Sequence, residues 1–307
     1  MNRKRLKLTA IALFVFLGFG IFFATHQAYS ADKKMVVGSK EFTEQRILGQ
    51  IMIALLEKHG FQCEDKTGLG GTLVARKALL AGQIDTYMEY TGTGLLVHLK
   101  HKEAITDPVK CYETVKKEDL EKNGLVWLPY MAFNNTYCLM MRREAAEATG
   151  IKTLSDLAAF VKANPDKIRF GLNAEFYARA DGYRALQKAY GFEFPSDKII
   201  KMSSGLLYKA LKDGQLEVAM GFATDGRIKG FNLVVLQDDR QFFPVYNPAP
   251  VVRKETAHQY PELEAIFAEL ARKLDTDAMT QLNYEVDIEH KSPKAVAEAW
   301  LKSVGLL

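Results

Sequence analysis

Residues 35–56 read MVVGSKEFTEQRILGQIMIALL, a short apolar strand followed by an amphipathic helix. Apolar side chains in the second half of this stretch recur at helical spacing after Thr43, which the pattern predicts as the helix cap. Strands are also predicted over 61–66 and 84–88, with a helix over 72–80 between them. Strand and helix alternate, which predicts βαβ units in a parallel sheet with right-handed crossovers.

A second set of the same elements begins near Tyr137. The pattern predicts strands over 138–142, 169–172 and 217–222, and helices over 154–161, 182–190 and 206–212. Residues 244–250, PVYNPAP, are predicted to form a connector, and strongly helical sequence follows to Leu307. We therefore predict two α/β lobes, each a mostly parallel sheet flanked by helices. Residues 31–136 and 242–307 form the first lobe, and residues 137–241 form the second.

The N-terminal residues 1–30 are typical of a secretory signal peptide. Four basic residues within the first seven precede an apolar run over 8–24, and Ala28-Tyr29-Ser30 offers small residues where signal peptidase reads the chain. Cleavage is expected after Ser30. The alternative is an uncleaved membrane anchor, although a run of 17 residues is at the short end for a membrane span. No cysteine lies near the cleavage site, so we expect a free periplasmic protein rather than a lipoprotein.

Removal of the signal peptide changes the charge balance. That segment carries four of the 41 Lys and Arg residues and none of the 37 Asp and Glu residues, which leaves 37 of each in the mature chain. A neutral chain gives no support to nucleic-acid or anionic-membrane binding. The three cysteines, Cys63, Cys111 and Cys138, lack zinc-site spacing, so no metal is expected. An oxidising compartment leaves a disulfide open, but three buried, inert thiols are the preferred interpretation.

Motifs of common enzyme classes are missing from the sequence. It contains no GxxxxGK[ST], HExxH or GxSxG and no kinase set. In GLGGTL, Leu73 occupies the position where a dinucleotide fingerprint needs its last glycine, so no such cofactor is expected. Surface positions are expected for five histidines: His59, His98, His101, His258 and His290. The sequence therefore favours a binding protein over an enzyme.

Polar and aromatic residues gather instead where predicted strands end. Ser39-Lys40 follows the first strand, Tyr90-Thr91-Gly92-Thr93 follows the third, and Asn134 to Tyr137 lie at the first crossing between the lobes. Open α/β sheets bind ligands at such strand ends.

Several of these segments resemble the ProX-type family of glycine betaine and choline binding proteins. The resemblance is carried by GSKEFTEQ (38–45), GLGGT (68–72), EYTGT (89–93), YGFEF (190–194), TDGR (224–227), DTD (275–277) and LNY (282–284). It covers essentially the whole mature chain. It implies a two-lobed periplasmic binding protein, the type II Venus-flytrap fold, with its ligand in the cleft between the lobes.

The resemblance also implies the ligand-binding residues. A box of aromatic rings encloses the trimethylammonium group in the family, and the matching positions here are Tyr90, Tyr137, Tyr208 and, in place of a tyrosine, Phe222. The ligand carboxylate is held at positions that match Lys40, Thr93 and Arg179. Asn135 stands where the family can place an acid.

A trimethylammonium group has no N–H to donate, whereas aromatic faces attract it through their quadrupoles. We therefore expect a periplasmic, monomeric solute-binding protein that captures glycine betaine or a related quaternary ammonium osmolyte. Its partners would be an ABC permease and, through it, an ATPase. Two alternatives remain open: a sensor module of the same fold that docks on a receptor, and a periplasmic enzyme acting on a small carboxylate.

Overall fold

The computed structural model describes residues 33–307, so the predicted signal peptide and its cleavage site lie outside the described residues. Within residues 33–307, no helix combines the length and apolar character that a membrane crossing requires. The same part of the chain contains no cluster of His, Cys, Asp and Glu side chains placed to hold a metal ion.

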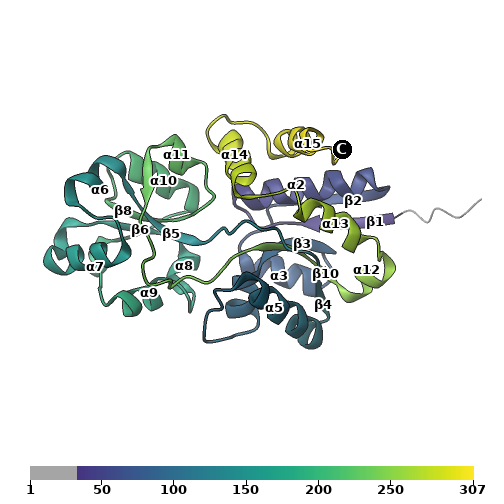
Figure 1. Ribbon diagram of the computed structural model, residues 1–307, viewed down its shortest axis with the longest axis horizontal. Helices are drawn as coiled ribbons and strands as arrows, with labels where there is room; N and C mark the ends of the chain where they lie inside the picture. Colours follow the sequence, from purple (N-terminus) through teal and green to yellow (C-terminus); the bar gives the residue numbers. More distant parts are fainter. Residues whose placement is uncertain (1–32) are drawn as a thin grey trace, which may run out of the picture. The chain divides into compact units, whose positions relative to one another are not determined.

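The first sheet has five strands in the order β2-β1-β3-β10-β4. Their bounds are β1 Lys33–Gly38, β2 Phe61–Lys66, β3 Thr86–Tyr90, β4 Leu125–Trp127 and β10 Pro248–Arg253. Helices cover both faces (Figure 1). One hydrophobic cluster packs α2 (Thr43–Lys58), α13 (Leu263–Ala271), α14 (Thr276–Asp287) and α15 (Pro293–Ser303) together. A separate cluster packs α3 (Thr72–Leu80) and α5 (Pro108–Asn123), and the short elements α4 (Thr91–Thr93), η1 (Gly94–His98) and α12 (Lys254–Gln259) complete this lobe.

The second sheet has the order β7-β6-β8-β5-β9. Its strands are β5 Tyr137–Arg142, β6 Phe170–Leu172, β7 Ile199–Lys201, β8 Val218–Phe222 and β9 Leu233–Val235. The surrounding helices are α6 (Arg143–Thr149), α7 (Leu154–Ala163), η2 (Pro165–Lys167), α8 (Ala174–Ala178), α9 (Tyr183–Tyr190), η3 (Ser196–Lys198), α10 (Ser204–Lys212) and α11 (Arg227–Gly230). One hydrophobic cluster joins them to the sheet, which gives the second lobe a core of its own.

Each sheet keeps the predicted parallel strands but also contains one antiparallel strand, which makes both sheets mixed. Strand β10 is antiparallel to β3 and β4, and β5 is antiparallel to β8 and β9. The reason is the connection between lobes: β5 and β10 each enter a sheet from the other lobe and not through a βαβ crossover.

Part of the predicted proline-rich connector is in fact strand β10. Proline lacks the N–H that a central strand normally uses. The proline carbonyls are nevertheless used, since Pro250 O accepts from the Leu128 N–H and Pro248 O from the Met131 N–H, both at 2.9 Å. Residues of this strand pair in register with β3, from Pro248 opposite Tyr90 to Val252 opposite Thr86.

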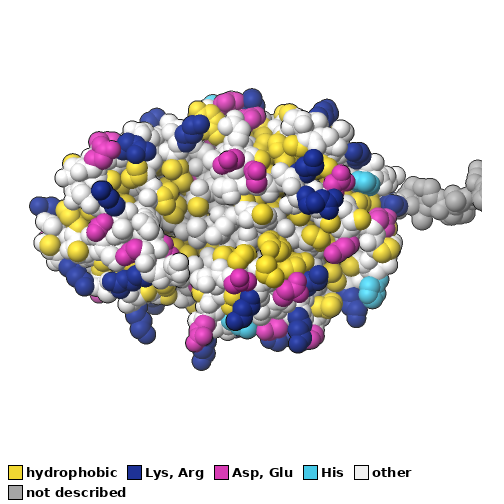
Figure 2. Space-filling model, viewed as in Figure 1, with side chains coloured by type: hydrophobic (Ala, Val, Ile, Leu, Met, Phe, Trp, Pro, Cys, Tyr) yellow, Lys and Arg dark blue, Asp and Glu magenta, His cyan; other side chains and the backbone are white. Residues whose placement is uncertain are grey.

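Charges of both signs are mixed on the surface. On the face drawn in Figure 2, Lys and Arg side chains lie interspersed with Asp and Glu side chains, in keeping with the equal numbers of the two kinds in residues 31–307. The three cysteines are unpaired; Cys111 and Cys138 are buried, whereas Cys63 is only half-buried. Burial raises the pKa of the Cys111 thiol to about 11, so its reactive thiolate is disfavoured.

Candidate ligand-binding cleft

A cleft of about 330 Å³ lies between the two lobes, at the strand ends of both sheets. Its lining comes from segments that follow β1, β2, β3, β6 and β7, from the end of β8 and from both crossings between lobes. Seven of the eight sequence-predicted residues line it: Lys40, Tyr90, Thr93, Asn135, Tyr137, Arg179 and Phe222. The structure thus brings most of the residues at the predicted strand ends together at one cleft.

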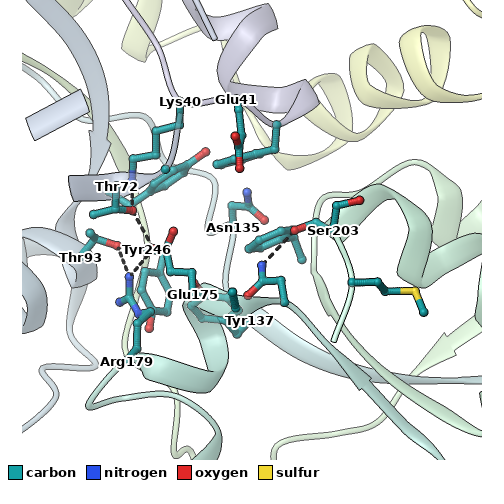
Figure 3. A pocket seen from close by; sticks show the side chains of 18 of the residues that line it. Lys40, Glu41, Thr72, Thr93, Asn135, Tyr137, Glu175, Arg179, Ser203 and Tyr246 are labelled. Atoms are coloured by element: carbon teal, nitrogen blue, oxygen red, sulfur yellow. Dashed lines mark hydrogen bonds and ion pairs between the residues drawn. The ribbon is translucent and has the colours of Figure 1, made fainter. Parts of the chain in front are cut away.

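Aromatic rings form a connected arc along the cleft (Figure 3). Tyr137 is the centre of this arc: its ring centroid lies 5.3 Å from that of Phe222 and 5.5 Å from that of Tyr246, which it meets edge to face. Phe42 stacks on Phe222 at 5.3 Å and extends the arc towards Tyr90, 6.3 Å away. Five rings from both lobes and a crossing therefore line one space.

Tyr208 is not brought to this cleft. It is fully buried in the core of the second lobe, where its hydroxyl accepts the Phe222 N–H at 2.9 Å. The Arg227 guanidinium lies over its ring, 4.5 Å from the centroid. Tyr208 therefore supports the end of β8 from behind, and the ring at the cleft is Tyr246, which the sequence analysis did not select because it lies in the proline-rich connector.

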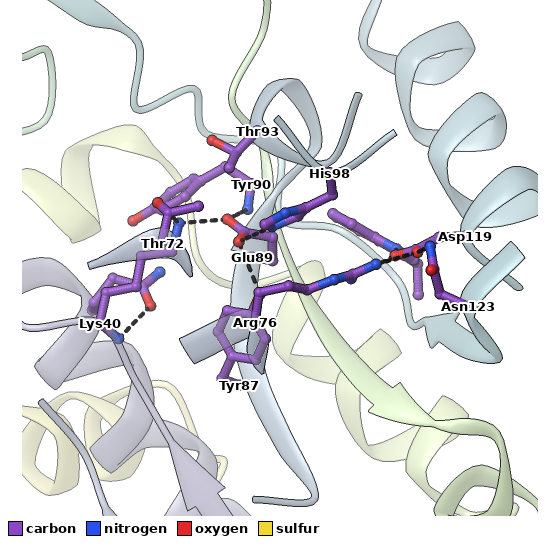
Figure 4. Close-up of polar contacts among 12 residues, drawn as sticks. Lys40, Thr72, Arg76, Tyr87, Glu89, Tyr90, Thr93, His98, Asp119 and Asn123 are labelled. Carbon is purple, nitrogen blue, oxygen red and sulfur yellow. Dashed lines mark hydrogen bonds and ion pairs between the residues drawn. The ribbon is translucent and has the colours of Figure 1, made fainter. Parts of the chain in front are cut away.

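Lys40 is already ion-paired. Its Nζ lies 2.6 Å from Glu89 Oε1 and donates to Thr72 Oγ1 at 3.1 Å, and all three side chains are buried (Figure 4). His98 donates to the other Glu89 oxygen at 2.9 Å. Burial alone raises the pKa of Glu89, but the charge of Lys40 and the His98 hydrogen bond hold that pKa well below its usual range. Glu89 is therefore a permanent counter-ion of Lys40.

His98 corrects another expectation. The sequence suggested a surface histidine, but the His98 side chain is only 3% exposed. Burial lowers its pKa, against the stabilising hydrogen bond to Glu89. It lies on the one-turn π-helix η1, and its ring contacts Glu89.

Arg179 carries its counter-ion two residues along the chain. Its Nε and Nη2 donate to the two Asp181 oxygens at 2.8 and 2.6 Å. Nη1 remains directed at the cleft, with only long contacts to Thr93 Oγ1 at 3.4 Å and Glu175 Oε1 at 3.3 Å. The Tyr246 hydroxyl donates to Asp181 at 2.8 Å, which fixes this group against the aromatic arc.

Two acids at the cleft carried no sequence signal. Glu41 and Glu175 both line it, and Glu175 accepts the Thr72 hydroxyl at 2.7 Å across the two lobes. The cleft thus combines aromatic faces, which attract organic cations, with paired cationic donors, which suit an anion.

Two α/β lobes, two crossings and a cleft between them define a two-lobed substrate-binding protein of the periplasmic type. The family described as "Substrate binding domain of ABC-type glycine betaine transport system" matches residues 33–303. The chain belongs to this family, and it is a transport substrate-binding protein and not an enzyme.

Individual relatives agree with this assignment. A glycine-betaine-binding protein of Pseudomonas aeruginosa is 44% identical over 276 residues, 88% of each chain. An ergothioneine transport permease/ergothioneine binding protein of Helicobacter pylori is 38% identical over 99% of this chain, which spans 54% of that longer protein. The solved structure of a glycine betaine/carnitine/choline ABC transporter protein is 32% identical, covers 90% of this chain and 99% of its own, and has a TM-score of 0.73.

Proposed function

We propose that this protein is the periplasmic, monomeric solute-binding component of an ABC importer and that it captures a small betaine, such as glycine betaine. The relatives are named for glycine betaine and ergothioneine, and the structural neighbour also for carnitine and choline. Each of these ligands carries a trimethylammonium group, and all except choline also carry a carboxylate. The proposed partners are the permease of that importer and, through it, its ATPase.

The observation that carries this proposal is the convergence of aromatic faces on one cleft. Tyr90, Tyr137, Phe222 and Tyr246 are the proposed walls around the cation. Each desolvated face contributes about 0.5 to 2 kcal/mol to binding a methylated cation. Four faces contribute about 2 to 8 kcal/mol before the costs of association, so micromolar binding is within reach.

The carboxylate end is assigned to Lys40, Thr93 and Nη1 of Arg179, whose present contacts are long. Because Glu89 and Asp181 already neutralise the two cations, their pull on a ligand carboxylate is weaker than that of unpaired charges. The trimethylammonium end therefore supplies most of the affinity, and Asn135 contributes a neutral edge beside it.

Calorimetric titration of the mature protein with glycine betaine, carnitine, ergothioneine, choline and glycine tests this proposal. The methylated ligands should bind, whereas glycine should hardly bind, because its ammonium would lose water without gaining acceptors in an aromatic box. Tyr246→Ala should weaken binding by about 1 to 2 kcal/mol, the contribution of one desolvated wall. Tyr260→Ala, in a ring pair with Phe61 elsewhere in the first lobe, is the matched control. Equal binding of glycine and glycine betaine would refute the proposal.

A further inference from the structure

Glu44 is a fully buried carboxylate that lies beside the proposed cage without lining it. It is in the first turn of α2, and four side chains donate to it. Its partners fall into two pairs, one for each carboxylate oxygen. Oε1 accepts the Tyr90 hydroxyl and Asn135 Nδ2, both at 2.7 Å. Oε2 accepts the Thr224 hydroxyl and Asn283 Nδ2.

The two oxygens face different parts of the molecule. Oε1 faces the cleft wall, since Tyr90 and Asn135 both line the ligand cleft. Oε2 faces the contact between lobes, because Thr224 follows β8 of the second lobe and Asn283 lies on α14 of the first. Asn283 Nδ2 also donates to the Thr224 carbonyl at 2.9 Å, so this contact involves both main chain and side chain.

We propose that Glu44 is a positioning residue that couples cation recognition to closure of the lobes. This inference rests on the proposed function, because it requires a cationic ligand in the cleft. Glu44 supplies a negative charge behind Tyr90 and the neutral Asn135, which stabilises a cation at that wall. The same carboxylate accepts a hydrogen bond from the Thr224 hydroxyl of the second lobe. This bond requires the lobes to be close together, because Glu44 belongs to the first lobe.

The coupling follows from the cost of an under-solvated buried charge. Burial raises the pKa of Glu44, while each of its four hydrogen bonds favours the charged form. Loss of the Thr224 donor leaves the Glu44 carboxylate with fewer hydrogen bonds, which makes its charged form less stable. The attraction between this carboxylate and a cation at Tyr90 is then weaker. A cation at Tyr90 favours the charged form and therefore strengthens the Thr224 contact.

A double-mutant cycle between Tyr90→Phe and Thr224→Val tests this link without altering Glu44. The Tyr90 hydroxyl donates to Glu44 Oε1 and the Thr224 hydroxyl donates to Glu44 Oε2, so Glu44 links the two. Each single variant should lower glycine betaine affinity about tenfold, the loss expected for one hydrogen bond to a charged group. The double variant should lose clearly less than the product of the two, because the second donor counts for less once the first is gone.

Thr114→Val is the control for Thr224→Val. Its hydroxyl donates to the Lys110 carbonyl within α5 at 2.7 Å, and not to a group at the contact between the lobes, so its effect on affinity should multiply with that of Tyr90→Phe. Small-angle scattering should also show less ligand-induced compaction in Thr224→Val, and Glu44→Gln should abolish the further effect of either variant. If the parent protein binds no quaternary amine, the proposed function and this inference both fail. If it binds and the Tyr90 and Thr224 effects multiply fully, the inference alone is wrong.

Discussion

Two tyrosines show what a residue's position in the sequence does and does not determine. Tyr208 and Tyr246 are both buried aromatic residues. Tyr208 lies on α10 and faces the core of the second lobe, whereas Tyr246 lies at a crossing and faces the cleft. A motif position predicts that an aromatic residue is present, but the side of the element that faces the ligand depends on how β8, α10 and the crossing pack. Three of the four predicted walls lie at the cleft for this reason, and the fourth does not.

Replacing Arg179 distinguishes the contribution of the ligand carboxylate to binding from that of the trimethylammonium group. Arg179→Ala removes Nη1 from the cleft and should weaken glycine betaine binding by about 1.5 to 3 kcal/mol, the usual size of a charge-assisted hydrogen bond. Choline has no carboxylate and should lose much less. Calorimetric titration with both ligands measures this difference. Arg169→Ala, which breaks an exposed pair with Glu217 away from the cleft, is the control. Equal losses for the two ligands would contradict the carboxylate assignment.

At the scale of elements, the sequence predicts helices and strands with a clear hydrophobic period. It does not predict how a strand is aligned with its neighbours in the sheet. Helix α2 and strand β2 lie where the sequence predicted them, because their patterns are long or bounded by Gly60. Thr43 is the first residue of α2 rather than its cap, and its hydroxyl serves Asp287 instead. The counter-ion Glu89 was also not foreseen, although it directly precedes Tyr90 in a selected motif. Its role depends on the register of β3 beside β1, which no local pattern specifies.

The contact between α11 and α14 predicts a pH effect on stability. Asp287, at the end of α14, lies 3.3 Å from the Arg227 guanidinium. Burial raises its pKa to about 6, against the opposing charge of Arg227. An unfolded aspartate titrates near pH 4, at about 3.9, so the folded state binds more protons between about pH 4 and 6. Ionised Asp287 therefore costs stability above about pH 6, and the cost disappears as the pH falls towards 4.

Asp287→Asn should remove this pH dependence. The variant's unfolding free energy relative to the parent should be higher at pH 7.5 than at pH 4.5 by about 1 to 2 kcal/mol, below the full linkage value because water reaches part of the side chain. Urea unfolding at the two pH values measures this difference. Asp277→Asn, at an exposed acid in the first turn of the same helix, controls for loss of a charge. The same free-energy difference at both pH values would show that Asp287 does not titrate in this range.

At the scale of the whole molecule, we expect ligand binding to depend on how closely the lobes approach each other. Thr72 contacts Glu175 and Thr93 contacts Arg179 at the ligand cleft. Elsewhere along the contact, the loop after β8 lies against α14. Gly226, in that loop, comes so near that an added Cβ would lie 2.4 Å from the Tyr284 main-chain N and Cα. Its backbone has φ −62°, which any residue adopts, so the glycine is required by close approach rather than by conformation.

Gly226→Ala should therefore penalise the closed arrangement and leave each lobe intact. The clash is with main chain, which cannot rotate away, and overpacking of this kind costs about 1 to 3 kcal/mol. Separation of the lobes relieves it, so the loss should occur in ligand affinity and in ligand-induced compaction. The unfolding free energy of the ligand-free protein should change by less than about 0.5 kcal/mol. Gly230→Ala is a milder control. Its Cβ would lie 2.7 Å from the end of the Ile288 side chain, and a side chain can move aside. Titration and small-angle scattering on both variants decide the matter: if Gly226→Ala binds and compacts like Gly230→Ala, closure does not require this approach of the β8 loop to α14.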